Sequence, residues 1–313
     1  MKTRHASQLR RLLGVLPPMA TLVCLLAAGA LAAPGVLAVE HTAILTTLPA
    51  GDGPGAIPLG AGPDGVFVDS SGLAIDEDGL LYLGARTKIV VLSATGAFSR
   101  EFPVDGRVGL IRHLAAAAGS VFVAGEQSVS AATPWQPGYL LQRYGTDGAL
   151  LGEYDRAGEA ADRTAPLDTV SRLVAYPDGA IALELVNRGV SYVVLAPPYR
   201  AVQAAAGLFR LPSGAFLQAL PEIATAGPQQ RRALLPMPDG RLMLLQQEDG
   251  NGAFALAEAG AAPGSAPHRT VAAAAARVLL SGREWALTPD GCHVLWLEAD
   301  PLGGRTLVRR ATL

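Results

Sequence analysis

The chain has 313 residues, half of them apolar and 17% charged, so it can bury one large core or two smaller ones. Its 25 basic and 27 acidic residues nearly balance, with a formal net charge of −2. This balance excludes the broad positive surface that nucleic acids or anionic membranes attract.

The first 38 residues have the pattern of an export signal. They begin with four basic residues, Lys2, Arg4, Arg10 and Arg11. Residues 12–38 then carry no charge and end in small residues of the kind that signal peptidase reads. We therefore predict a signal peptide over residues 1–38, and a periplasmic or extracellular protein.

An uncleaved membrane anchor is the alternative interpretation of residues 12–38. An apolar stretch of this length could cross the ~30 Å hydrocarbon core of a bilayer as a helix. Pro17, Pro18 and Pro34 interrupt such a helix and favour cleavage. Contact with a membrane is expected only through this segment. After cleavage, Cys292 is the one remaining cysteine, so no internal disulfide is expected and stability would depend on core burial.

Residues 39–65 predict a linker, because Gly and Pro dominate the segment that follows a short apolar run. That run, residues 43–48, is a candidate closing strand. Residues 60–65 match the letters of a dinucleotide-binding fingerprint. We reject that reading, because the motif works between a strand and a helix, whereas here a loop precedes it and the strand-like residues 66–68 follow.

From residue 66 onward one pattern recurs: an apolar run, a turn with Gly, and a second apolar run. The clear copies are residues 73–83, 173–183, 234–245 and 285–297, and the looser copies are residues 114–123 and 208–217. Short apolar runs joined by Asp-Gly or Pro-Asp-Gly predict β-hairpins, since Gly accepts a positive φ and Pro fixes the φ before it.

The spacing of the turn glycines predicts how these hairpins are grouped. The glycines are Gly79, Gly119, Gly179, Gly214, Gly240 and Gly291. Propeller blades recur about every 40–50 residues, so the short gap after Gly214 favours its hairpin being the outer half of a blade. Residues 88–92, 139–144 and 192–195 supply further strands. We predict an all-β fold, a β-propeller of five or six four-stranded blades over residues 66–313.

One segment has the composition of a helix. Residues 271–276 are rich in Ala, but the segment is short and precedes another apolar run. A helix, a strand and a linker are all compatible with it.

Residues 71–83, followed by residues 88–92 and Thr95-Gly96, resemble the repeat of NHL-type and related six-bladed β-propellers. The resemblance implies a fold and not an activity, because this superfamily includes binding scaffolds, adhesion modules and a few enzymes.

No catalytic residue, metal site or cofactor is predicted. Cys292 and His293 are adjacent on a predicted strand and would point to opposite faces, which disfavours a shared zinc ion. Resemblance to the gluconolactonase-like propellers would imply a metal-dependent hydrolase or lyase that holds its ion with Glu, Asn and Asp. The two asparagines, Asn187 and Asn251, lie off the predicted inner strands. Nor does a Gly-x-Ser-x-Gly nucleophile elbow occur.

Four arginines share one place in the repeat. Arg112 and Arg172 lie seven residues before their turn glycines, and Arg232 and Arg283 lie eight residues before theirs. This register would place them around one mouth of a propeller channel, where guanidinium groups favour carboxylate, phosphate or sulfate ligands. The alternative is that they cap strands or pair with neighbours such as Glu284.

The favoured function is therefore that of an exported module that binds a small anionic ligand or a protein partner. Two alternatives stay open at this point. One is the metal-dependent propeller hydrolase or lyase, and the other is a structural element of a larger envelope complex.

Overall fold

The computed structural model describes most of the chain beyond residue 41. The described residues are 42–63, 65–70, 72–127, 139–155, 170–176, 179–185, 191–196, 200–206, 208–210, 216–218, 232–237, 242–247, 253–258, 269–280 and 284–313. The chain divides into two units, Met1–Val39 and Glu40–Leu313. The predicted signal peptide or anchor lies outside the described residues.

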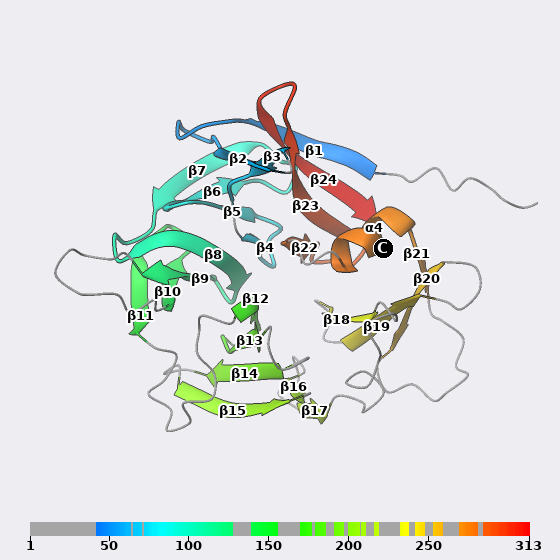
Figure 1. The fold of residues 1–313 in the computed structure, drawn as a ribbon. Helices are drawn as coiled ribbons and strands as arrows, with labels where there is room; N and C mark the ends of the chain where they lie inside the picture. The colour runs from blue at the N-terminus through cyan, green and yellow to red at the C-terminus, as the bar shows by residue number, and fades with distance from the viewer. Residues whose placement is uncertain are drawn as a thin grey trace, which may run out of the picture. The chain divides into compact units, whose positions relative to one another are not determined.

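Five antiparallel sheets of four strands make up most of the described chain (Figure 1). Sheet 1 contains β4 (Leu73–Ile75), β5 (Leu81–Ala85), β6 (Lys88–Leu92) and β7 (Phe98–Pro103). Sheet 2 contains β8 (Val108–Ala117), β9 (Ser120–Gln127), β10 (Tyr139–Gly145) and β11 (Leu150–Asp155). Sheet 3 contains β12 (Val170–Ala175), β13 (Ile181–Leu185), β14 (Ser191–Ala196) and β15 (Arg200–Ala206).

The last two sheets are built in the same way, with one exception to chain order. Sheet 4 contains β18 (Arg232–Pro236), β19 (Leu242–Gln247), β20 (Phe254–Glu258) and β21 (Arg269–Val271). Sheet 5 contains β22 (Trp285–Leu287), β23 (His293–Asp300), β24 (Arg305–Thr312) and, from the start of the chain, β1 (Thr42–Pro49). Two hairpins stand apart, β2 (Leu59–Gly62) with β3 (Gly65–Val68), and β16 (Leu208–Arg210) with β17 (Phe216–Gln218). The expectation of a mostly β fold with four-stranded antiparallel sheets is thus confirmed.

The turn between β4 and β5 shows why the acidic-Gly sequence folds as a hairpin. One carboxylate oxygen of Asp76 accepts the backbone N–H groups of Asp78 at 3.0 Å and Leu80 at 2.9 Å. The other oxygen accepts the hydroxyl of Tyr82 at 2.8 Å. Burial and the Asp76 carboxylate raise the pKa of Tyr82 above its usual range. Gly79, with φ of 79°, closes the turn without steric cost.

Both faces of sheet 1 are buried, because alternate residues of each strand point to opposite sides. Tyr82 of β5 packs with residues of β8, β9 and β10 in a cluster that we call the 1–2 core. Its neighbours Leu81 and Leu83 pack instead with residues of β1, β22, β23 and β24 in the 5–1 core. Sheet 1 is therefore layered between sheets 5 and 2.

Sheet 5 repeats this arrangement. Leu295 of β23 belongs to the 5–1 core. Val294 and Trp296, the residues on either side of it, belong to a third cluster with residues of sheet 4, the 4–5 core. The first strands also touch in order: β22 contacts β4, β4 contacts β8, and β8 contacts β12.

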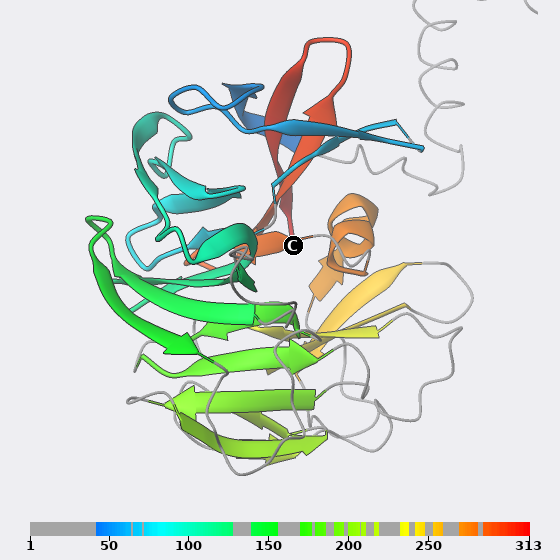
Figure 2. The ribbon, with the colours of Figure 1, turned by 60° about the vertical axis from the view of Figure 1, so that its left-hand side comes forward.

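The helix α4 (Ala273–Leu280) follows β21 and precedes β22 in the chain, and it packs beside β18 and β24 (Figure 1 and Figure 2). Its residues Ala275, Ala276, Val278 and Leu279 are buried in the 4–5 core. The Ala-rich segment, which the sequence left open, is therefore a strand up to Val271 and a helix from Ala273. Among the described residues, no helix combines the length and apolarity that crossing a membrane requires.

Residues 59–65 differ from the loop that was expected there. They form β2 and the start of β3, with Gly60 opposite Phe67 and Gly62 opposite Gly65. A β-carbon on Gly60 would lie 2.4 Å from the ring of Phe67, so the ring packs directly over Gly60 and would have to shift for a larger residue. The glycine-rich letters therefore belong to a hairpin and not to a strand–helix turn.

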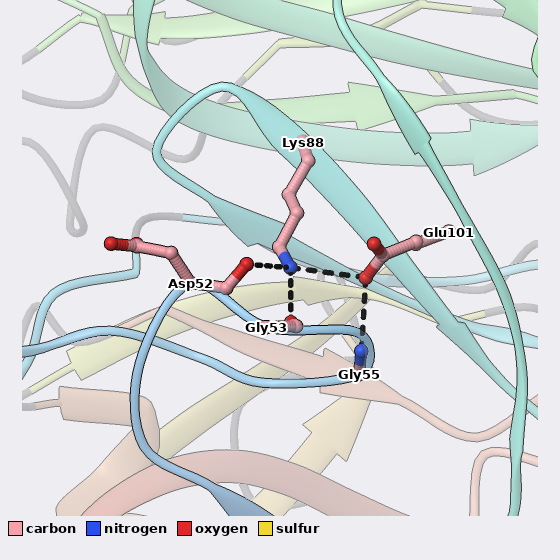
Figure 3. A network of polar contacts seen from close by, with 5 residues as sticks. All are labelled: Asp52, Gly53, Gly55, Lys88 and Glu101. Atoms are coloured by element: carbon pink, nitrogen blue, oxygen red, sulfur yellow. Dashed lines mark hydrogen bonds and ion pairs between the residues drawn. The ribbon is translucent and has the colours of Figure 1, made fainter.

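Residues 42–55 are joined to both sheet 5 and sheet 1. β1 pairs along its length with β24, from Thr42 opposite Ala311 to Pro49 opposite Arg305. The loop that follows is held against sheet 1 by Lys88 and Glu101, a contact that we call the latch (Figure 3).

The latch uses a charged pair to bind backbone groups of the loop. The ammonium of Lys88 donates to the carbonyl oxygens of Asp52 at 3.1 Å and Gly53 at 2.6 Å, and to Glu101 Oε2 at 3.0 Å. The same carboxylate oxygen accepts the backbone N–H of Gly55 at 2.9 Å. The Gly55 N–H and the Lys88 ammonium together hold the pKa of Glu101 below its ordinary value.

We predict that Lys88→Met lowers the free energy of unfolding by about 1–3 kcal/mol, because it removes hydrogen bonds from a largely buried charged group. Arg305→Met, which breaks an exposed pair with Asp300, should cost no more than about 1 kcal/mol. Denaturant unfolding of the three proteins measures both values. An equal cost for the two variants would contradict the role of the latch.

The latch should also make stability depend on pH. Because the pKa of Glu101 is lower in the folded chain, its contribution is present above the unfolded pKa of about 4.3 and is lost as pH falls through the folded pKa. The stability difference between wild type and Glu101→Gln should therefore be constant near neutral pH and shrink below about pH 4.

Candidate functional site

Polar side chains gather at one end of sheets 1, 2 and 5, where the first strands begin. At this end the backbone N–H of Gly84, in β5, donates to the carbonyl of Gly72 at 3.0 Å. The backbone N–H of Ile111, in β8, donates to the carbonyl of Arg86 at 2.8 Å. The first bond joins the start of β4 to β5, and the second joins the β5–β6 turn to β8. We call this end the entry end.

A close backbone contact positions β8 at the entry end. Gly72 has a φ of 105°, in the region that favours glycine. A β-carbon there would lie 2.7 Å from Cγ of Leu114 and 2.9 Å from its backbone nitrogen. Only a residue without a side chain lets β4 and β8 approach this closely.

An imidazole–carboxylate pair bridges sheets 2 and 5 across this contact. Nδ1 of His113, in β8, lies 2.6 Å from Oε1 of Glu284, which precedes β22. The two side chains are 12% and 26% exposed. A carboxylate on one ring nitrogen fixes the orientation of an imidazole, which is how proteins prepare His as a base or a metal ligand. No local sequence pattern marks this pair, because 171 residues separate its members.

Arg112 is the one predicted site residue whose side chain the structure describes. It lies inside β8 and not ahead of it, at a point where the register shifts between Ile111 and His113. Arg112 is thus the extra residue of a β-bulge, a device that often re-aims a side chain. Its guanidinium pairs with Glu126 of β9, at 2.7 Å for Nε to Oε1.

The other predicted arginines are described in part or not at all. The structure gives Arg172 and Arg232 by their backbone: Arg172 lies in β12 and Arg232 begins β18. Arg283 lies outside the described residues, as do Asn187 and Asn251. The described contact of Glu284 is with His113, and a pairing of Glu284 with Arg283 lies outside the described residues.

An acidic or amide residue on the second strand accompanies each of these arginines. In backbone register, Glu184 stands opposite Arg172 and Gln246 stands opposite Arg232. The register of β12 also shifts just before Arg172, as it does beside Arg112 in β8. An acid or amide five to seven residues after each turn glycine was the sequence signal for these partners.

A second ion pair completes the entry end. Nη2 of Arg86, in the β5–β6 turn, lies 2.7 Å from Oδ2 of Asp69, which follows β3. Arg86 has a φ of 56°, an uncommon conformation for a residue with a side chain. The described side chains here therefore alternate in charge and do not form one cationic patch.

Cys292 and His293 lie away from this end, at the β22–β23 turn. His293 begins β23, and the backbone N–H of Cys292 donates to Oδ1 of Asp290 at 2.9 Å. Within the described part of the chain, no group of three or more His, Cys, Asp or Glu side chains could hold a metal ion.

Comparison with known proteins leaves the family open. No family model matches the sequence, and no relative appears among curated proteins. One similar solved structure, a protein of unknown function from Bacteroides caccae, has 9% identity and a TM-score of 0.33, with 67% of this chain and 62% of that chain covered. This chain thus spans less than two thirds of that protein's length.

Another similar structure is a chain of the mitotic checkpoint complex. It has 11% identity and a TM-score of 0.39, with 78% of this chain and 90% of that chain covered. Both TM-scores lie below 0.5, so neither likeness supports a conclusion about this chain.

We predict that Gly72→Ala destabilises the protein more than Gly65→Ala does. Both glycines have a positive φ, of 105° and 113°, so the cost of strain, about 1–3 kcal/mol, is shared. Gly65 has open space around it, whereas Gly72 faces Leu114. Thermal unfolding of both variants measures the difference, and equal melting temperatures would contradict the close contact.

Proposed function

We propose that this chain is an exported β-propeller that binds a small anionic ligand at the entry end. The five four-stranded sheets would be its blades, and β1 would close the ring by completing the last of them. Two observations support closure. Sheets 1 and 5 are each buried on both faces by different neighbours, and the first strands of sheets 5, 1, 2 and 3 touch in that order. Export rests on the sequence of residues 1–38.

The observation that supports the proposed site is the recurrence of arginine on first strands, seven or eight residues before the turn glycine. Arg112, Arg172 and Arg232 occupy this place in three sheets. In a closed propeller the starts of the first strands surround one mouth of the central channel. Guanidinium groups that converge there would hold a carboxylate, phosphate or sulfate group by paired hydrogen bonds.

We predict that Arg172→Glu and Arg232→Glu each abolish binding of inorganic phosphate or sulfate to the purified protein, measured by calorimetry. Melting temperatures should stay near the wild-type value. Arg269→Glu, at an exposed position on the last strand of sheet 4, is the matched charge reversal and should bind as wild type does. Unchanged binding by Arg172→Glu and Arg232→Glu would remove the arginine site.

The His113–Glu284 pair favours a second candidate, a metal-dependent propeller hydrolase or lyase. An imidazole oriented by a carboxylate could act as a base or, together with other residues, as a ligand. Metal analysis of the purified protein separates the two proposals. A stoichiometric divalent ion that His113→Ala releases would favour the enzyme, and its absence from both proteins would favour the binding module.

A further inference from the structure

The guanidinium of Arg112 is already bonded to an oxyanion of the protein itself, the carboxylate of Glu126. Nε and Nη2 of Arg112 both donate to a single oxygen, Oε1 of Glu126, with Nε at 2.7 Å. These two donors form the side edge of the guanidinium, one of the edges that binds a carboxylate or phosphate through two parallel hydrogen bonds. Glu126 therefore occupies the place that an oxyanion ligand would take.

We propose that Glu126 is an internal competitor for the ligand at Arg112, so that an oxyanion binds by displacing the Glu126 carboxylate. This inference rests on the proposed anion site. In the absence of ligand, Glu126 neutralises Arg112 and keeps its donors bonded. When ligand arrives, its oxygens take over those hydrogen bonds and Glu126 turns towards solvent.

Exposure makes this exchange possible at low cost. The side chains of Arg112 and Glu126 are 39% and 45% exposed, so either can be solvated when the pair opens. Pairs as exposed as this contribute little to stability. The latch is a contrast, because Lys88 is only 17% exposed and also holds two backbone carbonyls. The latch would be costly to open, whereas the Arg112–Glu126 pair would not.

The backbone register extends the idea to the other sheets. Glu184 stands opposite Arg172, which repeats the combination of arginine and glutamate on the first two strands. In sheet 4 the residue opposite Arg232 is Gln246, which carries no charge. Of the three arginines, Arg232 is therefore the one whose cross-strand neighbour competes least with an anion.

The displaced carboxylate should also limit affinity. Glu126 stays beside the occupied site after it leaves Arg112, and two negative groups a few ångströms apart repel one another. Removing its charge should then help binding in two ways, by freeing the donors and by ending the repulsion. A carboxylate that merely positions Arg112 would have the opposite effect, because its loss would disorder the guanidinium.

The experiment is calorimetric titration of the full exported chain with inorganic phosphate at low ionic strength. We expect Glu126→Gln to bind phosphate about 2- to 10-fold more tightly than wild type, which is the range expected when an exposed competing ion pair is removed. Glu126→Ala should change affinity in the same direction, so the result does not depend on one variant folding well. Circular dichroism would check the fold of each.

Glu298→Gln is the matched control. Glu298 also pairs with an arginine, Arg309, and is 41% exposed, but it joins the second and third strands of sheet 5. The Glu298→Gln substitution removes the same charge as Glu126→Gln and should leave phosphate affinity unchanged. A similar gain in both variants would mean that net charge alone sets affinity, and would overturn the proposal.

The remaining outcomes separate this inference from the function on which it rests. If wild type binds phosphate and Glu126→Gln binds equally or more weakly, Glu126 is no competitor, while the anion site stands. If neither wild type nor any Glu126 variant binds phosphate or sulfate, the proposed anion site fails and the inference fails with it. If Glu126→Gln binds phosphate and wild type shows no binding, the result supports both the anion site and the role of Glu126 as a competitor.

Discussion

Burial of both faces of a sheet is the constraint on which the rest of this structure depends. Along β5 and β23, successive residues point into different cores, so each sheet needs a neighbour on either side. A row of such sheets always leaves two outer faces in water unless the row returns on itself. The N-terminal strand β1 completes the sheet formed by the C-terminal strands, and that sheet packs against sheet 1 in the 5–1 core.

The loop after β1 is fixed by contacts of another kind, made by charged side chains. A single strand added to a sheet edge is easily lost if the loop beyond it is free. Here Lys88 holds that loop through backbone carbonyls, and Glu101 accepts one of its N–H groups. Because these contacts involve the backbone of residues 52–55, they tolerate a loop sequence made largely of Gly and Pro. The cost is a dependence on the charge of Glu101.

Local signals predicted the hairpins well and predicted the contacts between them poorly. An Asp-Gly turn specifies its own geometry, as Asp76 shows, and the expected strand at residues 88–92 coincides with β6. The hairpin at residues 59–68 was missed, because its glycines resemble a loop until Phe67 is seen to cover Gly60. The His113–Glu284 contact depends on packing between sheets, which no local pattern records.

The arginines combine a feature that the sequence predicts with one that only the structure shows. Their recurrence is visible in the sequence, since it follows the turn glycines, but their electrostatic state is not. A bulge at Arg112 shifts the register by one residue, and that shift decides which side chain of β9 lies within reach. The partner turns out to be an acid. A count of cationic residues would therefore overstate the attraction of this end for anions, because an anion at Arg112 would meet a guanidinium edge already bonded to Glu126. Selectivity in such a site depends on how well the ligand's oxygens replace those of Glu126, so geometry and not net charge would decide which anions bind.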